Sequence, residues 1–220
     1  MQKRGWHFSG VDEGRIAFSS LEGSTISGST RPRKLLDHVR ATSDFDHTLL
    51  CVMGRSGLPL GEHGMIGTPR PWLHDELVHV PMLLRLPRAA EAGLRIDALT
   101  QPVDLLPTFL EALGEPLPAM HGHSLWPLIR SETAEVRPYA VSGLRVDGHE
   151  SWLLRSVEWA LHLPIDAAER APQLFVKPED RWEVNDLYQQ QIESADVMEK
   201  ALRQFAAAIR QPGALTYPVV

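Results

Sequence analysis

The side chains of this sequence that could take part in chemistry gather in one glycine-rich loop, residues 54–71. The loop holds five glycines, and its polar side chains could line a pocket: Arg55, Glu62, His63, Thr68 and Arg70. Two guanidinium groups would give such a pocket a basic character, which suits an anionic ligand. The alternative for Glu62 and His63 is structural, with Glu62 capping backbone amides and His63 binding a carbonyl group that holds the turn.

Two apolar runs, residues 49–53 and 82–86, flank this loop. Each run is short and continuous, and the first ends at Gly54, which is typical of a strand buried on both faces. A loop of this length in a compact chain is commonly functional, and ligands of α/β proteins bind outside the carboxyl ends of strands. We therefore expect a site at the end of the first strand.

Several motifs follow one another in a recognisable order, and they are LGEHG at residues 60–64, VPMLLR at 80–85, PVDLLPTFL at 102–110, HGHSLWPL at 121–128 and VNDL at 184–187. Their order resembles that of the sulfatases in the alkaline-phosphatase-like superfamily, over roughly residues 33–210. The resemblance implies an α/β fold, a partial alkaline-phosphatase-like sandwich with the later strands of the main sheet and its helices. It also implies a small carboxy-terminal subdomain of antiparallel sheet and helix, and an ancestry in sulfuric ester hydrolysis.

Inside this pattern the residues that carry the family's chemistry have changed. The resemblance places the family's metal-binding Asp-His pair on Arg55 and Ser56, and its catalytic lysine on Thr68. Calcium or magnesium, the ions that the family uses, need oxygen ligands, whereas a guanidinium group is a cation that only donates hydrogen bonds. Arg70 could restore the lost charge, but a proline on each side restricts its direction. We therefore expect neither a metal nor another cofactor at these positions.

The nucleophile of the family is also missing. Active sulfatases carry a Cys/Ser-x-Pro-x-Arg motif, and the 220 residues contain none. Cys51 precedes Arg55 by four positions, but the proline is absent and the cysteine lies in an apolar run, where a thiol is usually inert. The expectation is a truncated pseudoenzyme, a sulfatase-like protein that lacks the amino-terminal nucleophile half and is inactive alone.

Two alternatives to a silent enzyme remain open at this point. The first is a binding module for an anion or a sulfated glycan. The second is a fragment that assembles with a separately encoded amino-terminal half into an active sulfatase. The expected partners are accordingly a sulfated small molecule or glycan, a second copy of the chain, or that separate half.

Histidines elsewhere invite a metal-site hypothesis. The segment 74–79, HDELVH, has two histidines and two carboxylates, but five positions separate its histidines, and a helix places such residues on different faces. His121 and His123 bracket a glycine and would share a side only in an extended segment. A structural role is the favoured interpretation of both groups.

Charge and composition exclude several classes of partner. The formal net charge is −6 and the sequence pI is about 5.9, which argues against nucleic acid and anionic membranes. One cysteine excludes an internal disulfide framework. The first residues, MQKRGWHFSGVDEG, lack the apolar segment of a signal peptide, which makes the cytoplasm the default expectation.

The surrounding elements are predicted from periodicity and from residues that break helices. Residues 1–31 are expected to be a poorly ordered arm, 32–138 a partial sulfatase-like α/β domain, and 139–220 the small antiparallel subdomain. Helices are predicted at residues 33–41, 103–113 and 198–209, and further strands at 140–144, 152–156, 159–163 and 173–176.

Overall fold

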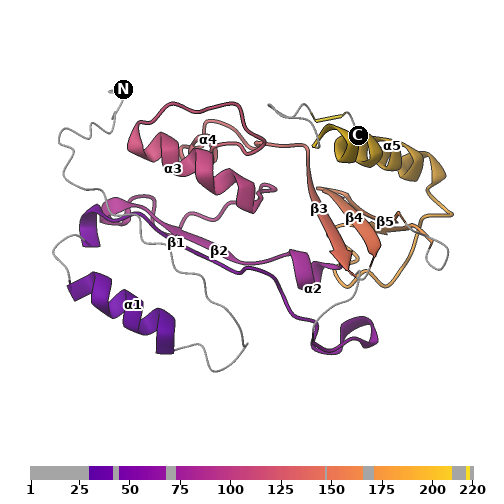
Figure 1. The fold of residues 1–220 in the computed structure, drawn as a ribbon, viewed down its shortest axis with the longest axis horizontal. Coiled ribbons are helices and arrows are strands. Elements are labelled where there is room, and N and C mark those ends of the chain that lie inside the picture. The colour runs from indigo at the N-terminus through magenta and orange to yellow at the C-terminus, as the bar shows by residue number, and fades with distance from the viewer. Residues whose placement is uncertain are drawn as a thin grey trace.

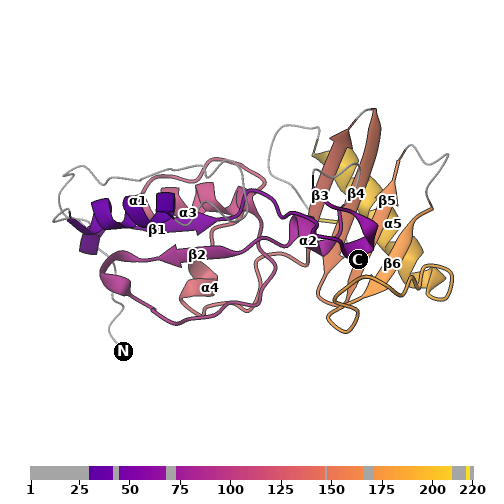
Figure 2. The ribbon, with the colours of Figure 1, turned by 90° about the horizontal axis from the view of Figure 1, so that it is seen from below.

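The structure is a computed structural model that describes residues 30–41, 45–67, 73–146, 148–165, 171–209 and 217–218. Its helices and strands follow one another as α1 (Thr30–Ala41), β1 (Leu50–Met53), α2 (Asp75–Val78), β2 (Met82–Arg85), α3 (Leu105–Leu113), α4 (Trp126–Ile129), β3 (Tyr139–Val146), β4 (His149–Ser156), β5 (Trp159–Pro164), β6 (Gln173–Val176) and α5 (Ile192–Ala208) (Figure 1). The strands form two separate sheets, and in Figures 1 and 2 the short helix α2 lies between them.

Strands β1 and β2 form an antiparallel ribbon at one end of the molecule (Figure 2). The two predicted strands are confirmed, but the prediction that both faces are buried is wrong. Val52 and Leu83 lie opposite each other in the ribbon, and 37% and 68% of their surfaces are exposed. Apolar residues on both faces therefore do not establish that both faces are covered, because a two-stranded ribbon has few neighbours to cover them.

Helix α4 supplies most of the buried core beside this ribbon. A cluster of Leu86, Leu125, Trp126, Leu128 and Ile129 is buried, and Met82 and Leu84 of β2, Leu49 just before β1 and Ala112 of α3 are among the side chains that pack against it. Helix α3 ends as predicted at Gly114, whose φ of 73° is the left-handed conformation that glycine adopts most readily.

The second sheet has the strand order β3-β4-β5-β6, with every neighbouring pair antiparallel. Helix α5 packs on one face of this sheet (Figure 2), where Met198, Leu202 and Phe205 join its buried core. The opposite face carries Phe175 and contacts Leu77 of α2. The short helix that follows the glycine-rich loop is thereby fixed against the second sheet.

A buried ion pair connects the ribbon half of the molecule to the second sheet. Asp104, in the 3-10 helix that precedes α3, pairs with Arg137, which precedes β3, and both side chains are fully buried. The same carboxylate accepts hydrogen bonds from the backbone amides of Gln101 (2.7 Å) and His123 (2.9 Å). Each acceptor oxygen is satisfied, as a buried charge requires.

The predicted helices and strands of residues 139–209 are confirmed, with ends that differ by a few residues. The largest difference is at α5, which begins at Ile192 rather than at Met198. Ile192 and Val197 near its start are 56% and 48% exposed, and the buried residue there is the small Ala195, so the apolar periodicity of the sequence does not mark this start.

The predicted arm, residues 1–31, lies outside the described residues except for Thr30 and Arg31, which belong to α1. The predicted division into domains stays a prediction, and β3 begins at its second boundary. Within the part of the chain that is described, no helix has the length and apolar character needed to cross a membrane.

Candidate functional site

Arg55 and Ser56 follow β1 after a single residue, Gly54, and both are exposed. They line one end of a groove of about 1100 Å³ that runs between the ribbon and the second sheet. Arg155 of β4 lines the same groove, and its buried Nη1 atom has no hydrogen-bond partner among the described residues. Burial lowers the pKa of this guanidinium group. Charges of both signs line the groove, because Asp75, Glu91 and Asp97 lie along it together with Arg55, Arg95 and Arg155.

The next residue, Gly57, fixes the course of the loop. Its amide donates to the carbonyl oxygen of Leu77 at 2.8 Å, and a Cβ atom at this position would lie 1.8 Å from the carbonyl oxygen of Glu76. Only glycine allows so close an approach, because any other residue would overlap the backbone of α2. The loop is thus pressed against the end of this helix.

Glu62 stabilises the turn that carries His63. Its carboxylate accepts a hydrogen bond from the amide of Leu60 at 2.6 Å. Hydrogen bonds from its own amide and from that of Leu60 lower the pKa of Glu62. His63 itself has a φ of 51°, in the left-handed region, and the tight turn directs its side chain toward the second sheet.

His63 connects the loop to two other segments of the chain. Its Nδ1 atom lies 2.7 Å from Glu76 Oε1, and its Nε2 atom lies 3.2 Å from the carbonyl oxygen of Glu183. Because both ring nitrogens face acceptors, both hydrogen bonds form only with the doubly protonated imidazolium. Burial opposes that charge, but the bonds to Glu76 and to the Glu183 carbonyl together raise the pKa of His63.

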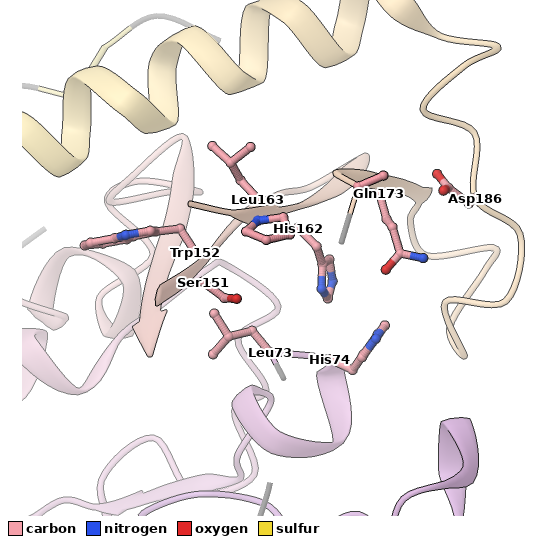
Figure 3. Close-up of a pocket in the computed structure, with 10 residues that line it drawn as sticks. Leu73, His74, Ser151, Trp152, His162, Leu163, Gln173 and Asp186 are labelled. Carbon is pink, nitrogen blue, oxygen red and sulfur yellow. The ribbon is translucent and has the colours of Figure 1, made fainter. Parts of the chain in front are cut away.

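A buried carboxylate, Glu183, lies at the centre of a cluster that sequence reasoning missed. Its Oε2 atom lies 2.5 Å from His74 Nδ1 and 3.4 Å from His162 Nε2, and its Oε1 atom lies 2.9 Å from Lys177 Nζ. The imidazole rings of His74 and His162 lie near each other, with centroids 4.5 Å apart (Figure 3). His63 stacks on His74 at 3.9 Å.

The charges of this cluster compensate one another. Burial alone would raise the pKa of Glu183, but the two histidines and the ammonium group around it hold this pKa well below its ordinary value. Lys177 is shared, since its Nζ atom also donates to Asp75 Oδ2 at 2.7 Å. Burial lowers the pKa of His74 and favours its neutral form, in which Nδ1–H donates to Glu183.

A cavity of about 330 Å³ opens beside the cluster (Figure 3). Its walls come from the start of α2 and from three strands of the second sheet, and they include Leu73, His74, Ser151, Trp152, His162 and Gln173. The side chains of His74 and His162 therefore lie between the buried Glu183 and a space that a small molecule or water can enter.

The sequence-predicted residues do not all come together. Arg55 and Ser56 line the groove, and Glu62 and His63 lie in the turn near the cluster. Thr68 and Arg70 fall outside the described residues, so a shared pocket stays a prediction. The two histidines of segment 74–79 lie in different surroundings, because His74 is buried in the cluster and His79 is exposed.

Comparisons with known proteins find the same family that the order of the sequence motifs resembles. The family described as N-sulphoglucosamine sulphohydrolase, C-terminal, matches residues 61–141. The chain is 31% identical over 100 residues to an N-acetylglucosamine-6-O-sulfatase of Bacteroides thetaiotaomicron, which covers 45% of this chain and 18% of the relative. It is 33% identical over 115 residues to human arylsulfatase K, which covers 47% of this chain and 21% of the relative.

Solved structures share the fold. BT4656, determined with its substrate D-glucosamine-2-N,6-O-disulfate, superposes with a TM-score of 0.67 at 24% identity, over 81% of this chain and 37% of that one. BT1596, a 2-O GAG sulfatase, superposes with a TM-score of 0.69 at 22% identity, over 83% and 40%.

The architecture is therefore that of the alkaline-phosphatase-like α/β class, as the sequence predicted. Within the chain, residues 61–141 resemble the carboxy-terminal region of the N-sulphoglucosamine sulphohydrolase family. The chain spans about a fifth of the length of the bacterial and human relatives named above.

Proposed function

We propose that this chain is the carboxy-terminal part of a sulfuric ester hydrolase unit, and that its 220 residues alone do not cleave sulfate esters. The observation that carries the proposal is the combination of the family's motif order with the replacement of its metal and lysine positions by Arg55, Ser56 and Thr68. The direct test is sulfate release by the purified chain, for which no turnover is expected.

The single cysteine supports the same proposal. Cys51 lies within β1, opposite Leu84 of β2, and burial raises the pKa of its thiol. A thiol with a raised pKa is mostly protonated at neutral pH and is a poor nucleophile. Its place inside a strand also keeps it from the loop where the family's chemistry would occur.

We expect no calcium or magnesium site at the end of β1. Arg55 is exposed there and would repel a cation, and Ser56 offers a single neutral oxygen. Calorimetric titration of the wild-type chain and of Ser56→Ala with either ion should give the same result. A micromolar calcium site that Ser56→Ala abolishes would contradict this prediction.

A second candidate function, binding of a sulfated sugar without turnover, is favoured by Arg155. Its buried Nη1 atom lacks a hydrogen-bond partner among the described residues, and Arg155 is one of the residues that line the groove, so a sulfate oxygen that enters beside it could accept its hydrogen bond. BT4656 acts on a glucosamine disulfate. We propose that the groove of this chain takes the same class of ligand.

The test is titration with D-glucosamine-2-N,6-O-disulfate, followed by calorimetry or by chemical-shift changes. Arg155→Gln should weaken binding by about tenfold or more, because a hydrogen bond to a charged group contributes about 1.5–3 kcal/mol. Arg145→Gln is the matched control, an exposed arginine on the neighbouring strand β3. Equal affinity of wild type and Arg155→Gln would contradict the assignment of the ligand to this groove.

The exposed face of the β1–β2 ribbon supports the proposed association with a second copy or with a separately encoded half. Val52 and Leu83 are adjacent apolar side chains on that face. Contact with a further chain would remove this surface from water, which stabilises an assembly in proportion to the apolar area buried.

A further inference from the structure

Three donor side chains converge from segments far apart in the sequence. His74 precedes α2, His162 lies in β5, and Glu183 lies in the turn that follows β6. One ligand atom from each, two imidazole nitrogens and a carboxylate oxygen, lie within 4.8 Å of one another, and all three residues are buried. Such a combination is typical of a site for a divalent transition metal.

His162 supplies an observation that an ordinary salt-bridge network does not explain. Its side chain is 10% exposed, and its Nε2 atom makes no hydrogen bond of normal geometry among the described residues. The nearest carboxylate atom, Glu183 Oε2, lies 3.4 Å away. A buried ring nitrogen without a hydrogen bond is costly unless something else occupies the direction of its lone pair.

One donor pair already has the spacing of a metal site, and His74 and Glu183 would have to move apart. Ligand bonds of about 2.0–2.1 Å in a tetrahedral arrangement place donor atoms roughly 3.3 Å apart. The separation between His162 and Glu183, 3.4 Å, already matches this geometry. His74 Nδ1, now 2.5 Å from the carboxylate, would move away by roughly 0.8 Å as the metal replaces the proton between them.

The surroundings support the carboxylate as a ligand through one oxygen. Lys177 Nζ forms an ion pair with the other oxygen, Oε1, at 2.9 Å but without hydrogen-bond geometry, while Oε2 faces the two histidines. Because Lys177 also pairs with Asp75, its charge is divided between two carboxylates. Partners of this kind orient metal ligands and tune their basicity.

We propose that His74, His162 and Glu183 bind one zinc-class divalent cation, with a further coordination position open to the adjacent cavity. Two imidazoles and one carboxylate favour zinc or cobalt over calcium or magnesium, which prefer oxygen ligands alone. The site is separate from the end of β1, where Arg55 and Ser56 lie. It ties α2 to the second sheet and presents a metal-bound position to a small ligand.

The test is cobalt binding to the untagged chain after treatment with a chelator. One equivalent of Co²⁺ should give the intense visible absorption of a tetrahedral site, and Zn²⁺ should displace it. His162→Gln should weaken cobalt affinity by at least about tenfold, since even the loss of an outer-shell partner costs that much. His79→Gln, an exposed histidine at the end of α2, is the matched control and should bind as wild type does.

Glu183→Gln provides a second variant of nearly equal volume, and it should also lose the tetrahedral spectrum. The fold of each variant is checked by circular dichroism without metal. Absence of cobalt binding by the folded wild-type chain would overturn the proposal. An unchanged affinity in folded His162→Gln would overturn it as well, because the metal would then bind elsewhere.

Discussion

Replacement of Arg137 by methionine is expected to lower the free energy of unfolding by about 3–5 kcal/mol, the cost of removing one member of a buried ion pair. The change leaves the carboxylate of Asp104 charged in an interior site where both side chains are inaccessible to solvent. It also removes hydrogen bonds from Arg137 to Gln101 (2.6 Å) and to the hydroxyl of Tyr217 (2.7 Å). Urea unfolding should show a lower midpoint with an unchanged slope.

A double variant separates the effect of leaving Asp104 charged and unpaired from the effect of lost packing. Asp104→Asn removes the charge that Arg137→Met would leave unpaired, so the double variant should be more stable than the sum of the two single changes implies. The exposed pair Arg203 and Glu199 is the control, because Arg203→Met should change stability by less than about 1 kcal/mol. Strict additivity at Asp104 and Arg137 would show that the pair is not coupled.

Gly57→Ala is expected to destabilise the chain by about 1–3 kcal/mol or more, because the added methyl group would overlap the backbone of α2, which cannot rotate aside as a side chain can. Its Cβ atom would lie 1.8 Å from the carbonyl oxygen of Glu76. Thermal unfolding should begin several degrees lower, since 1 kcal/mol shifts the midpoint by about 2–4 °C for a chain of this size.

Ser56→Ala is the matched control for this prediction, because Ser56 is the exposed neighbour of Gly57. Its midpoint should remain close to that of the wild type. If Gly57→Ala and Ser56→Ala had the same midpoint of thermal unfolding, the close approach of the loop to α2 would not contribute to stability.

Local patterns in the sequence predict most of the second half of the fold. Short apolar runs separated by turn residues predict β3 to β6, and the glycine at 114 predicts the end of α3. These predictions succeed because strand alternation and helix termination depend on neighbouring residues. The covering of a strand depends on distant residues instead, and this explains why the exposure of Leu83 does not follow from the apolar run that contains it.

The candidate site is harder to predict for the same reason. Glu183 lies 109 positions from His74, and no spacing rule connects them. Two local signals could have drawn attention to the cluster. His162 is the one histidine inside the apolar strand β5, and Lys177 follows the apolar strand β6 directly. Each is a polar residue at a position that the strand pattern places in the core, where it must find a partner.

The resemblance to a family predicts what local patterns cannot. It predicts that Arg55, Ser56 and Thr68 replace functional residues, although nothing in their own neighbourhoods marks them as such. The structure adds that a glycine is required at position 57 by the contact with α2. This contact between Gly57 and α2 is a structural reason for the glycine that does not depend on any chemistry in the loop.

Sulfate release from D-glucosamine-2-N,6-O-disulfate and 4-nitrophenyl sulfate, followed by ion chromatography, tests the central claim most directly. The purified chain should release no sulfate above the buffer control. The double variant Arg55→Asp with Ser56→His should be equally silent, because nucleophile, metal and cation act together and one restored part recovers no rate. Turnover by the wild-type chain that is lost in His63→Gln would contradict the account.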